Sequence, residues 1–396
     1  MKYQADCHKP HSTPPYTLVY TNGCFDAMME RIEGARRLAI DTEADSLYHY
    51  FEKVCLLQLS TDNETFIIDP LTVTAIKKLG RLMSDPSIEK VFHAASYDIL
   101  CLRRDYNFTF TNIFDTHMAG SLLGYEFLGL ATMMEELLGV YHPKGCQRDD
   151  WSRRPLLAGQ LKYAAMDTHH LLGLRDALEK ELRFKGRMEW ALEEFAAEAV
   201  AERSEKKFDP DGFRHIKGFR MLQTRERLAL RALYLFRDEA AQKLDAPAFK
   251  VINNSVLMDL ARRPPKSAQE MFKRQGVSFR VARRFGGEIV KLIAAAANDD
   301  PSVLDIPTNT VPKPPRRVAR HSLELLKKWR LEKSEELKIS VGVIFPANLL
   351  ETVAATPPSN LNEFTALPGI RRWRVREFGQ EILQILQDAN ETFESE

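Results

Sequence analysis

The chain has 396 residues, of which 44% are hydrophobic and 28% charged, so it is long enough for two to three domains with buried cores. No apolar stretch approaches the roughly 20 residues that span a bilayer, and the opening MKYQADCHKPHSTPP lacks the apolar region of a secretion signal. The five cysteines have no CxxC spacing, which argues against a disulfide framework and against a structural zinc site. We therefore expect a cytoplasmic protein that does not enter a membrane.

Charge is distributed unevenly along the chain, although the formal net charge is only +1. Residues 1–210 hold 25 basic and 32 acidic side chains, whereas residues 211–298 hold 18 basic and 8 acidic ones. Residues 299–396 hold 13 basic and 15 acidic side chains. An acidic half followed by a basic module suggests a cation site beside a phosphate-binding surface, although a solvated surface could show the same imbalance.

The first half of the chain predicts a sheet with helices around it. Short apolar stretches between turns predict strands at residues 16–20, 36–41, 54–60 and 65–69. A helix is expected near 24–34, and helical periods dominate 72–182 apart from one more strand at 91–95. This order predicts an α/β or α+β domain with a central sheet flanked by helices over residues 1–195, followed by a helical connector at 196–212.

The second half predicts two copies of one helical module. Residues 213–297 have helical periodicity, and the proline-rich stretch 298–320 is expected to be an extended linker. Residues 321–390 then repeat the order helix, PP turn, helix and glycine. We predict an internal duplication of a module of about 70–80 residues.

Acidic side chains follow the predicted strands in an ordered set. Asp41 and Glu43 end a strand two residues apart, which puts both on one face. Asp98 falls in the first turn of a helix after a later strand, and Tyr163 and Asp167 are four apart on a late helix. Each feature alone also has an ordinary structural explanation, so the prediction of one site rests on their combination.

Four carboxylates in one site would repel one another by about 3 kcal/mol per pair at ~5 Å and an effective dielectric constant of ~20. Bound cations would remove this cost. Oxygen ligands without cysteine or paired histidine favour Mg²⁺ or Mn²⁺ over zinc.

These residues resemble the motifs of the DEDD exonuclease superfamily, and within it those of ribonuclease D. Asp41-Thr42-Glu43 is similar to the first exonuclease motif, His93 to Asp98 to the second, and Tyr163 to Asp167 to the third. The resemblance extends through residues 139–167, and Tyr163 indicates the tyrosine branch because Lys162 stands where the other branch has histidine. Both helical repeats resemble HRDC domains. The resemblance implies an α/β domain of the ribonuclease H-like fold, with a mixed central sheet flanked by helices, followed by two all-α HRDC domains.

The resemblance implies a 3′ to 5′ exoribonuclease that releases nucleoside 5′-monophosphates, with precursors of transfer RNA as the expected substrate and a monomer as the expected state. Asp41 would bridge two ions about 4 Å apart, Glu43 and Asp167 would complete the first, and Asp98 would support the second. Tyr163 would orient the attacking water. A DNA-directed exonuclease and a catalytically silent RNA-binding adaptor remain as alternatives.

Further polar residues are candidates for contacts with RNA. His93 is expected near the terminal nucleotide, and basic or polar side chains elsewhere are expected to meet phosphates: Lys144, Gln147, Arg148, Lys273, Arg280, Arg283 and Arg284. For the residues of the 144–148 loop, a role in stabilising the loop is the alternative.

Overall fold

A computed structural model of the chain describes residues 14–143, 145–201, 208–305 and 317–394. Contacts group the chain into two units. The first unit comprises Met1–Glu43, Val54–Arg203 and Lys313–Glu396, and the second comprises Ala44–Lys53 and Ser204–Pro312. The opening segment that bears on a secretion signal lies outside the described residues up to position 13, as does Cys7.

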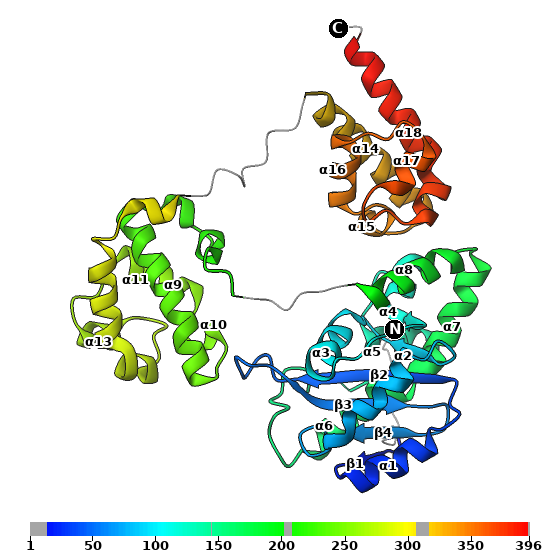
Figure 1. The fold of residues 1–396 in the computed structure, drawn as a ribbon, viewed down its shortest axis with the longest axis horizontal. Helices are drawn as coiled ribbons and strands as arrows, with labels where there is room; N and C mark the ends of the chain where they lie inside the picture. Colours follow the sequence, from blue (N-terminus) through cyan, green and yellow to red (C-terminus); the bar gives the residue numbers. More distant parts are fainter. Residues whose placement is uncertain (1–13, 144, 202–207, 306–316, 395–396) are drawn as a thin grey trace, which may run out of the picture. The chain divides into compact units, whose positions relative to one another are not determined.

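A six-stranded mixed sheet forms the centre of the first unit (Figure 1). Its strands are β1 Thr17–Val19, β2 Arg37–Ala44, β3 Val54–Ser60, β4 Thr65–Ile68, β5 Glu89–Phe92 and β6 Ile113–Asp115. The spatial order is β1-β4-β3-β2-β5-β6, in which β3 and β4 pair antiparallel while β2 and β6 run parallel to β5. The predicted fold class is confirmed, and β6 is a strand that the sequence pattern did not predict.

Helices pack on this sheet and cover its length. They are α1 Asn22–Arg31, α2 Gly80–Ser84, α3 Ser96–Tyr106, α4 Thr116–Leu123, α5 Leu130–Leu138, α6 Ala158–His169, α7 Leu171–Phe184 and α8 Met188–Val200, with a 3₁₀ helix at Thr74–Leu79. Helix α6 contacts β3 and β4, while α7 contacts β5 and α8 contacts β6. The active-site residues described below come from β2, α3 and α6.

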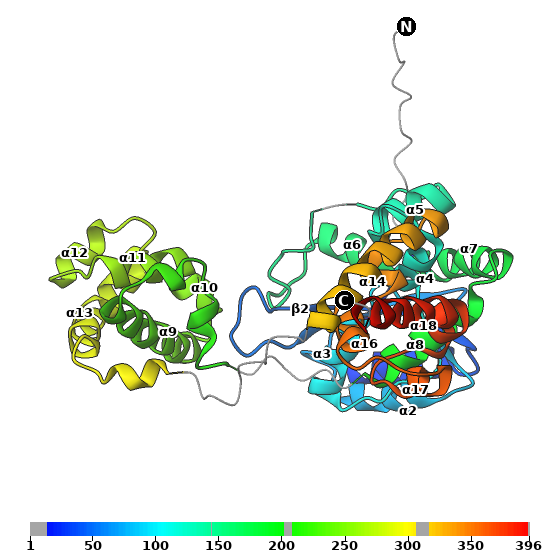
Figure 2. The ribbon, with the colours of Figure 1, turned by 90° about the horizontal axis from the view of Figure 1, so that it is seen from above.

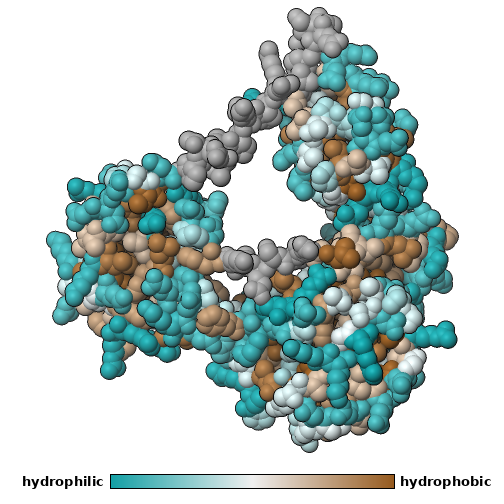
Figure 3. Space-filling model, viewed as in Figure 1, coloured by the Kyte–Doolittle hydropathy of each residue, from teal (hydrophilic) through white to brown (hydrophobic). Residues whose placement is uncertain are grey.

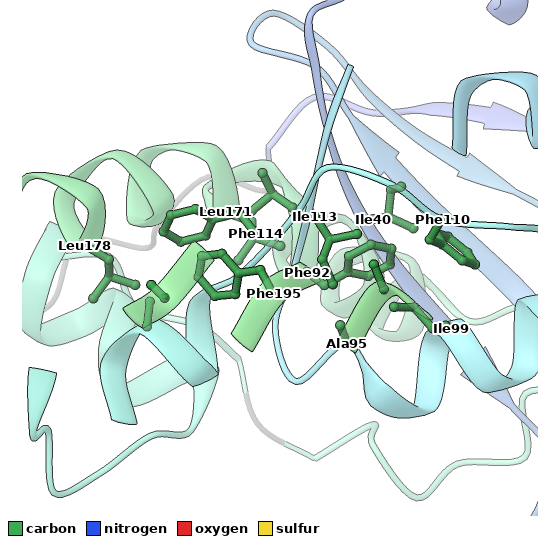
Figure 4. Packing of buried hydrophobic residues seen from close by; sticks show 14 of the residues in the cluster. Ile40, Phe92, Ala95, Ile99, Phe110, Ile113, Phe114, Leu171, Leu178 and Phe195 are labelled. Carbon is green, nitrogen blue, oxygen red and sulfur yellow. The ribbon is translucent and has the colours of Figure 1, made fainter. Parts of the chain in front are cut away.

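The core beside the central strands is apolar and densely packed. Figure 4 shows Ile40 of β2, Phe92 of β5 and Phe114 of β6 among the labelled side chains of this core. The ring of Phe114 lies 4.7 Å from that of Phe195 on α8, measured between centroids. Removing this apolar area from water stabilises the sheet by roughly 25 cal/mol per Å². The end of β2 is thereby held rigidly in place.

The second helical module is part of the first unit. It consists of α14 Arg317–Leu337, α15 Val341–Ile344, α16 Ala347–Ala355, α17 Leu361–Ala366 and α18 Arg372–Glu394. Trp373 of α18 is fully buried and stacks on Trp190 of α8, with ring centroids 4.5 Å apart. Glu194 of α8 accepts hydrogen bonds from the Trp373 indole and from Arg374. The module therefore shares a core with the catalytic body.

The first helical module forms the body of the second unit. Its helices are α9 Thr224–Leu244, α10 Ala248–Val251, α11 Asn254–Arg262, α12 Ala268–Lys273 and α13 Phe279–Ala296, with 3₁₀ turns at Gly212–His215, Phe219–Met221 and Pro301–Leu304. Asp245, just after α9, accepts hydrogen bonds from the backbone of Tyr50 and Phe51 and pairs with His49. Residues 44–53 are therefore held by this module, which was not expected from the sequence.

The sequence boundaries 1–195, 196–212, 213–297, 298–320 and 321–390 stay predictions, but two segments differ from expectation. Helix α8 ends at Val200, and residues 208–211 of the expected helical connector are not helical, with Pro210 disfavouring a helix there. The expected linker ends earlier, because α14 begins at Arg317, just after Pro315. Residues 202–207 and 306–316 lie outside the described part. Within the described ranges, every helix is too short or too polar to cross a membrane.

Candidate active site

Two of the acidic side chains come from the end of β2. Asp41 and Glu43 lie on the same face of this strand because side chains alternate along it. With Asp167 of α6 they form a cluster in which one carboxylate oxygen from each residue lies within 4.8 Å of the others. Three oxygens at this spacing fit the ligand sphere of one small divalent cation.

Asp98 is brought to the cluster by a turn that Asp115 stabilises. The backbone before α3 passes through Ala94, whose φ of 62° is unusual for a residue other than glycine. The Asp115 carboxylate accepts hydrogen bonds from the N–H groups of Ala94 and Ala95, each at 2.9 Å, and thereby holds this turn. Asp98 follows in the first turn of α3 and accepts a hydrogen bond from the Thr42 hydroxyl of β2.

Helix α6 supplies Tyr163 and Asp167 one turn apart, so that both point to the same side. The Tyr163 ring lies 6.2 Å from the ring of Trp151, which is 1% exposed and packs in a small core with Ala164 and Ala165. The structure thus brings together all five residues that the sequence predicted for the site.

The electrostatics of the cluster match a site for cations. Burial, with repulsion from Asp167 and Asp98, raises the pKa of Glu43 from 4.5 to about 9. Burial raises the pKa of Asp98 from 3.8 to about 7 and the pKa of Asp41 well above its ordinary value. Among the described residues, Asp167 Oδ2 is buried without a hydrogen-bond partner. The mutual repulsion of the buried carboxylates and the unpartnered oxygen both fit a divalent cation.

The loop between α5 and α6 is fastened to the sheet. The Arg154 guanidinium makes two hydrogen bonds to the Asp69 carboxylate, at 2.6 and 2.8 Å, and one to the Cys55 carbonyl. This bidentate pair is partly shielded from water, so it is stronger than an exposed ion pair. It holds Trp151 behind Tyr163.

The residues predicted to contact RNA fall in different environments. Gln147 and Arg148 are exposed on the α5–α6 loop, and Lys144 lies outside the described residues. His93 lies at the end of β5, where its ring contacts the Thr116 hydroxyl at 2.9 Å. Burial and the neighbouring His117 lower the pKa of His93 to about 4, so its ring is neutral at pH 7. A neutral His93 cannot offer a positive charge to a phosphate.

The basic candidates of the first helical module gather at the start of α13. Arg280, Arg283 and Arg284 are exposed in its first two turns, and Lys273 is exposed at the end of α12. Gly276 in the intervening turn has φ of 84°, and a Cβ there would lie 2.7 Å from Val256. The glycine is therefore needed for the turn. Figure 3 shows hydrophilic residues over much of the surface of the same module.

One residue at the site was not predicted from the sequence. His142 is 4% exposed, and its Nε2 atom lies 2.8 Å from Asp167 Oδ1. Its ring meets the Tyr163 ring edge to face, with centroids 5.3 Å apart. A single histidine in an irregular loop has no periodic signal, so only the length of the resemblance around residues 139–167 could have drawn attention to it.

Comparisons with known proteins agree with this geometry. Residues 16–183 match the 3′-5′ exonuclease family, and residues 226–293 and 321–386 each match the HRDC domain. Ribonuclease D of Zymomonas mobilis is 33% identical over 274 residues, which cover 66% of this chain and 68% of that protein. Ribonuclease D of Acidiphilium cryptum is 26% identical over 383 residues, which cover 94% of each.

The fold is also similar to a solved structure over nearly the whole of both chains. The crystal structure of Escherichia coli RNase D, described as an exoribonuclease involved in structured RNA processing, superposes with a TM-score of 0.67. The sequences are 26% identical, and the match covers 95% of this chain and 99% of that one. A mixed sheet bearing a carboxylate cluster, followed by two HRDC modules, defines a 3′ to 5′ exonuclease. The chain belongs to the ribonuclease D family and is a 3′ to 5′ exoribonuclease.

The raised pKa values predict how the stability of the metal-free protein varies with pH. Folded Glu43 keeps its proton up to about pH 9, whereas the unfolded chain loses it near 4.5. The folded state therefore binds more protons across this window, and the free energy of unfolding falls as pH rises through it. With EDTA present, Glu43→Gln should melt several degrees above the parent near pH 9, and the gain should vanish near about pH 4.

Thermal unfolding followed by circular dichroism measures this difference, with the exposed Glu33→Gln as the matched control. If the gain in melting temperature of Glu43→Gln does not depend on pH, the carboxyl is not held in a proton-binding environment.

Proposed function

We propose that this exoribonuclease trims the 3′ ends of transfer RNA precursors by hydrolysis at a site of two divalent cations, Mg²⁺ or Mn²⁺. The observation that carries the proposal is the convergence of Asp41, Glu43 and Asp167, with oxygens within 4.8 Å of one another, beside Asp98 and Tyr163. Processing of structured RNA by the similar Escherichia coli enzyme supports a structured substrate.

In this proposal each side chain of the site has its own role. Asp41 would hold both cations, Glu43 and Asp167 would hold the first, and Asp98 would support the second. When bound, the ions activate the attacking water and stabilise the departing 3′-oxygen. Tyr163, held by Trp151 and by the edge of His142, orients the water toward the terminal phosphodiester. The products are a nucleoside 5′-monophosphate and an RNA shortened by one nucleotide.

The first HRDC module is proposed to hold the RNA. Arg280, Arg283 and Arg284 stand exposed at the N-terminus of an 18-residue helix, where the helix dipole adds to their attraction for phosphate. Gln147 and Arg148 are proposed as contacts closer to the catalytic site, and His93 as a neutral hydrogen-bonding group there.

The proposed setting is the cytoplasm, and the proposed state is a monomer. Within the described part of the chain, Cys24, Cys55, Cys101 and Cys146 form no disulfide, and Cys55 and Cys101 are buried. Cysteines that form no disulfide are typical of a reducing compartment.

Asp41→Asn should leave the fold intact and abolish turnover, because the amide cannot neutralise two cations. Release of nucleotides from a 3′-labelled RNA in Mn²⁺ measures turnover, and circular dichroism checks the fold. The exposed Asp26→Asn serves as the control and should retain the parent rate. A rate for Asp41→Asn within about tenfold of the parent, a barrier change under about 1.4 kcal/mol, would contradict the assigned role.

The substrate is tested by digesting a 3′-extended transfer RNA precursor, an unstructured RNA and a DNA of the same sequence side by side. We expect the precursor to be trimmed to its mature end and both RNAs to be shortened faster than the DNA. Equal rates on DNA and RNA would favour the DNA-directed alternative. Absence of turnover on all three, with RNA still bound, would favour the silent adaptor.

The arginines of α13 predict the salt dependence of binding. Arg283→Ala combined with Arg284→Ala should weaken RNA binding at 50 to 200 mM salt and reduce the slope of log affinity against log salt by about 1.4, since each lost phosphate contact removes about 0.7. Fluorescence anisotropy in the Asp41→Asn background measures this without turnover. The control replaces Lys327 and Lys328 with alanine, which removes the same charge from the second module. An unchanged slope in the arginine variant would refute the contact.

A further inference from the structure

His142 has two ring nitrogens that face different groups. Nδ1 lies 2.8 Å from the Pro143 carbonyl, which can only accept, so Nδ1 carries a proton and donates it. This contact fixes the plane of the ring. Nε2 is consequently directed at Asp167 Oδ1, 2.8 Å away.

The contact with His142 gives the two oxygens of Asp167 different surroundings. Oδ1 faces His142, while Oδ2 is buried and has no hydrogen-bond partner among the described residues. Nε2 approaches Oδ1 at ion-pair distance, although the angle falls outside hydrogen-bond geometry. A carboxylate constrained on one oxygen holds the other in a fixed direction, and one oxygen of this carboxylate lies within 4.8 Å of oxygens of Asp41 and Glu43.

The same ring also restricts Tyr163. The two rings meet at 90° with centroids 5.3 Å apart, an edge-to-face arrangement that favours one orientation of the tyrosine. Trp151 packs on Tyr163 at 6.2 Å. His142 therefore touches both residues that α6 contributes to the site.

We propose that His142 is a positioning residue, which sets the Asp167 carboxylate for the cation and limits the rotation of Tyr163. The inference rests on the proposed function of Asp167 and Tyr163. Within the described part of the chain, the mutually close ligand atoms are those of Asp41, Glu43 and Asp167 and do not include His142. The geometry supports a role in which His142 contacts Asp167 Oδ1 without joining the ligand cluster.

Three variants separate positioning from simple packing. His142→Leu keeps the bulk but has no polar atom. His142→Gln keeps a polar nitrogen at the reach of Nε2, and His142→Asn keeps the amide but is too short to reach Asp167. The control is His169→Leu at the end of α6, where Nδ1 of His169 contacts the Thr65 hydroxyl rather than the site. Circular dichroism without metal checks that each variant is folded.

The first readout is Mn²⁺ binding without RNA, measured by the electron paramagnetic resonance signal of free Mn²⁺. Loss of a group that orients a metal ligand typically costs about 10- to 100-fold in metal affinity. We expect a loss of about that size in His142→Leu and His142→Asn, with His142→Gln and His169→Leu within about threefold of the parent. Steady-state kinetics should show kcat falling in the first two variants while KM for RNA changes little.

Two results would overturn the proposal. One is an Mn²⁺ affinity equal to that of the parent in both His142→Leu and His142→Asn. If His142→Leu does not fold, the result for His142→Asn alone is used. The other is nitrogen coupling from a coordinated imidazole in the pulsed resonance spectrum of bound Mn²⁺, lost in His142→Leu, which would make His142 a direct ligand.

Asp41→Asn is measured in the same experiments. It distinguishes failure of the proposed function from failure of the role of His142. If Asp41→Asn still binds Mn²⁺ and cleaves RNA, the proposed function fails. If Asp41→Asn loses both while the His142 variants lose neither, only the role of His142 fails.

Discussion

Negative charge confined to a poorly hydrated space is the constraint on which the catalytic unit depends. Glu43, Asp98 and Asp167 are each at most 9% exposed, and burial raises the pKa of all three. Free side chains would rotate toward water to escape this cost. The scaffold prevents it, since the apolar core fixes β2, and Asp115 fixes the turn before α3. Cation binding is therefore coupled to the rigidity of the fold around it.

The two HRDC modules share an order of helices but use their surfaces differently. The first leaves arginines exposed at the start of α13, within a segment of 18 basic and 8 acidic residues. The second buries Trp373 and Arg374 against Trp190 and Glu194 of α8. Figure 2 shows the second module, drawn in orange and red, over α8. Duplication has thus produced one module suited to polyanions and one that extends the core of the catalytic body.

Sequence periodicity predicted most of the sheet and the local spacing of the site residues, while the resemblance to the exonuclease motifs assigned the five main residues to one site. Alternation places Asp41 with Glu43, and one helical turn places Tyr163 with Asp167. Strand β6 has only three residues, Ile113–Asp115, too few for a periodic signal. His142 lies in a loop and meets Asp167 only through folding. The contact between Trp190 and Trp373 could not be predicted either, because an apolar position on a helix does not specify which residue packs against it.

The stacked rings of Trp190 and Trp373 give a spectroscopic signal that reports whether the second HRDC module is packed on α8. Two indoles 4.5 Å apart and inclined by 14° are close enough for their electronic transitions to couple, which produces paired bands of opposite sign in circular dichroism. The chain has two other tryptophans, Trp329 and Trp151. Trp151 lies beside Tyr163, so its fluorescence samples the catalytic pocket. Docking of the last module and events at the metal site can thus be followed separately in the unlabelled protein.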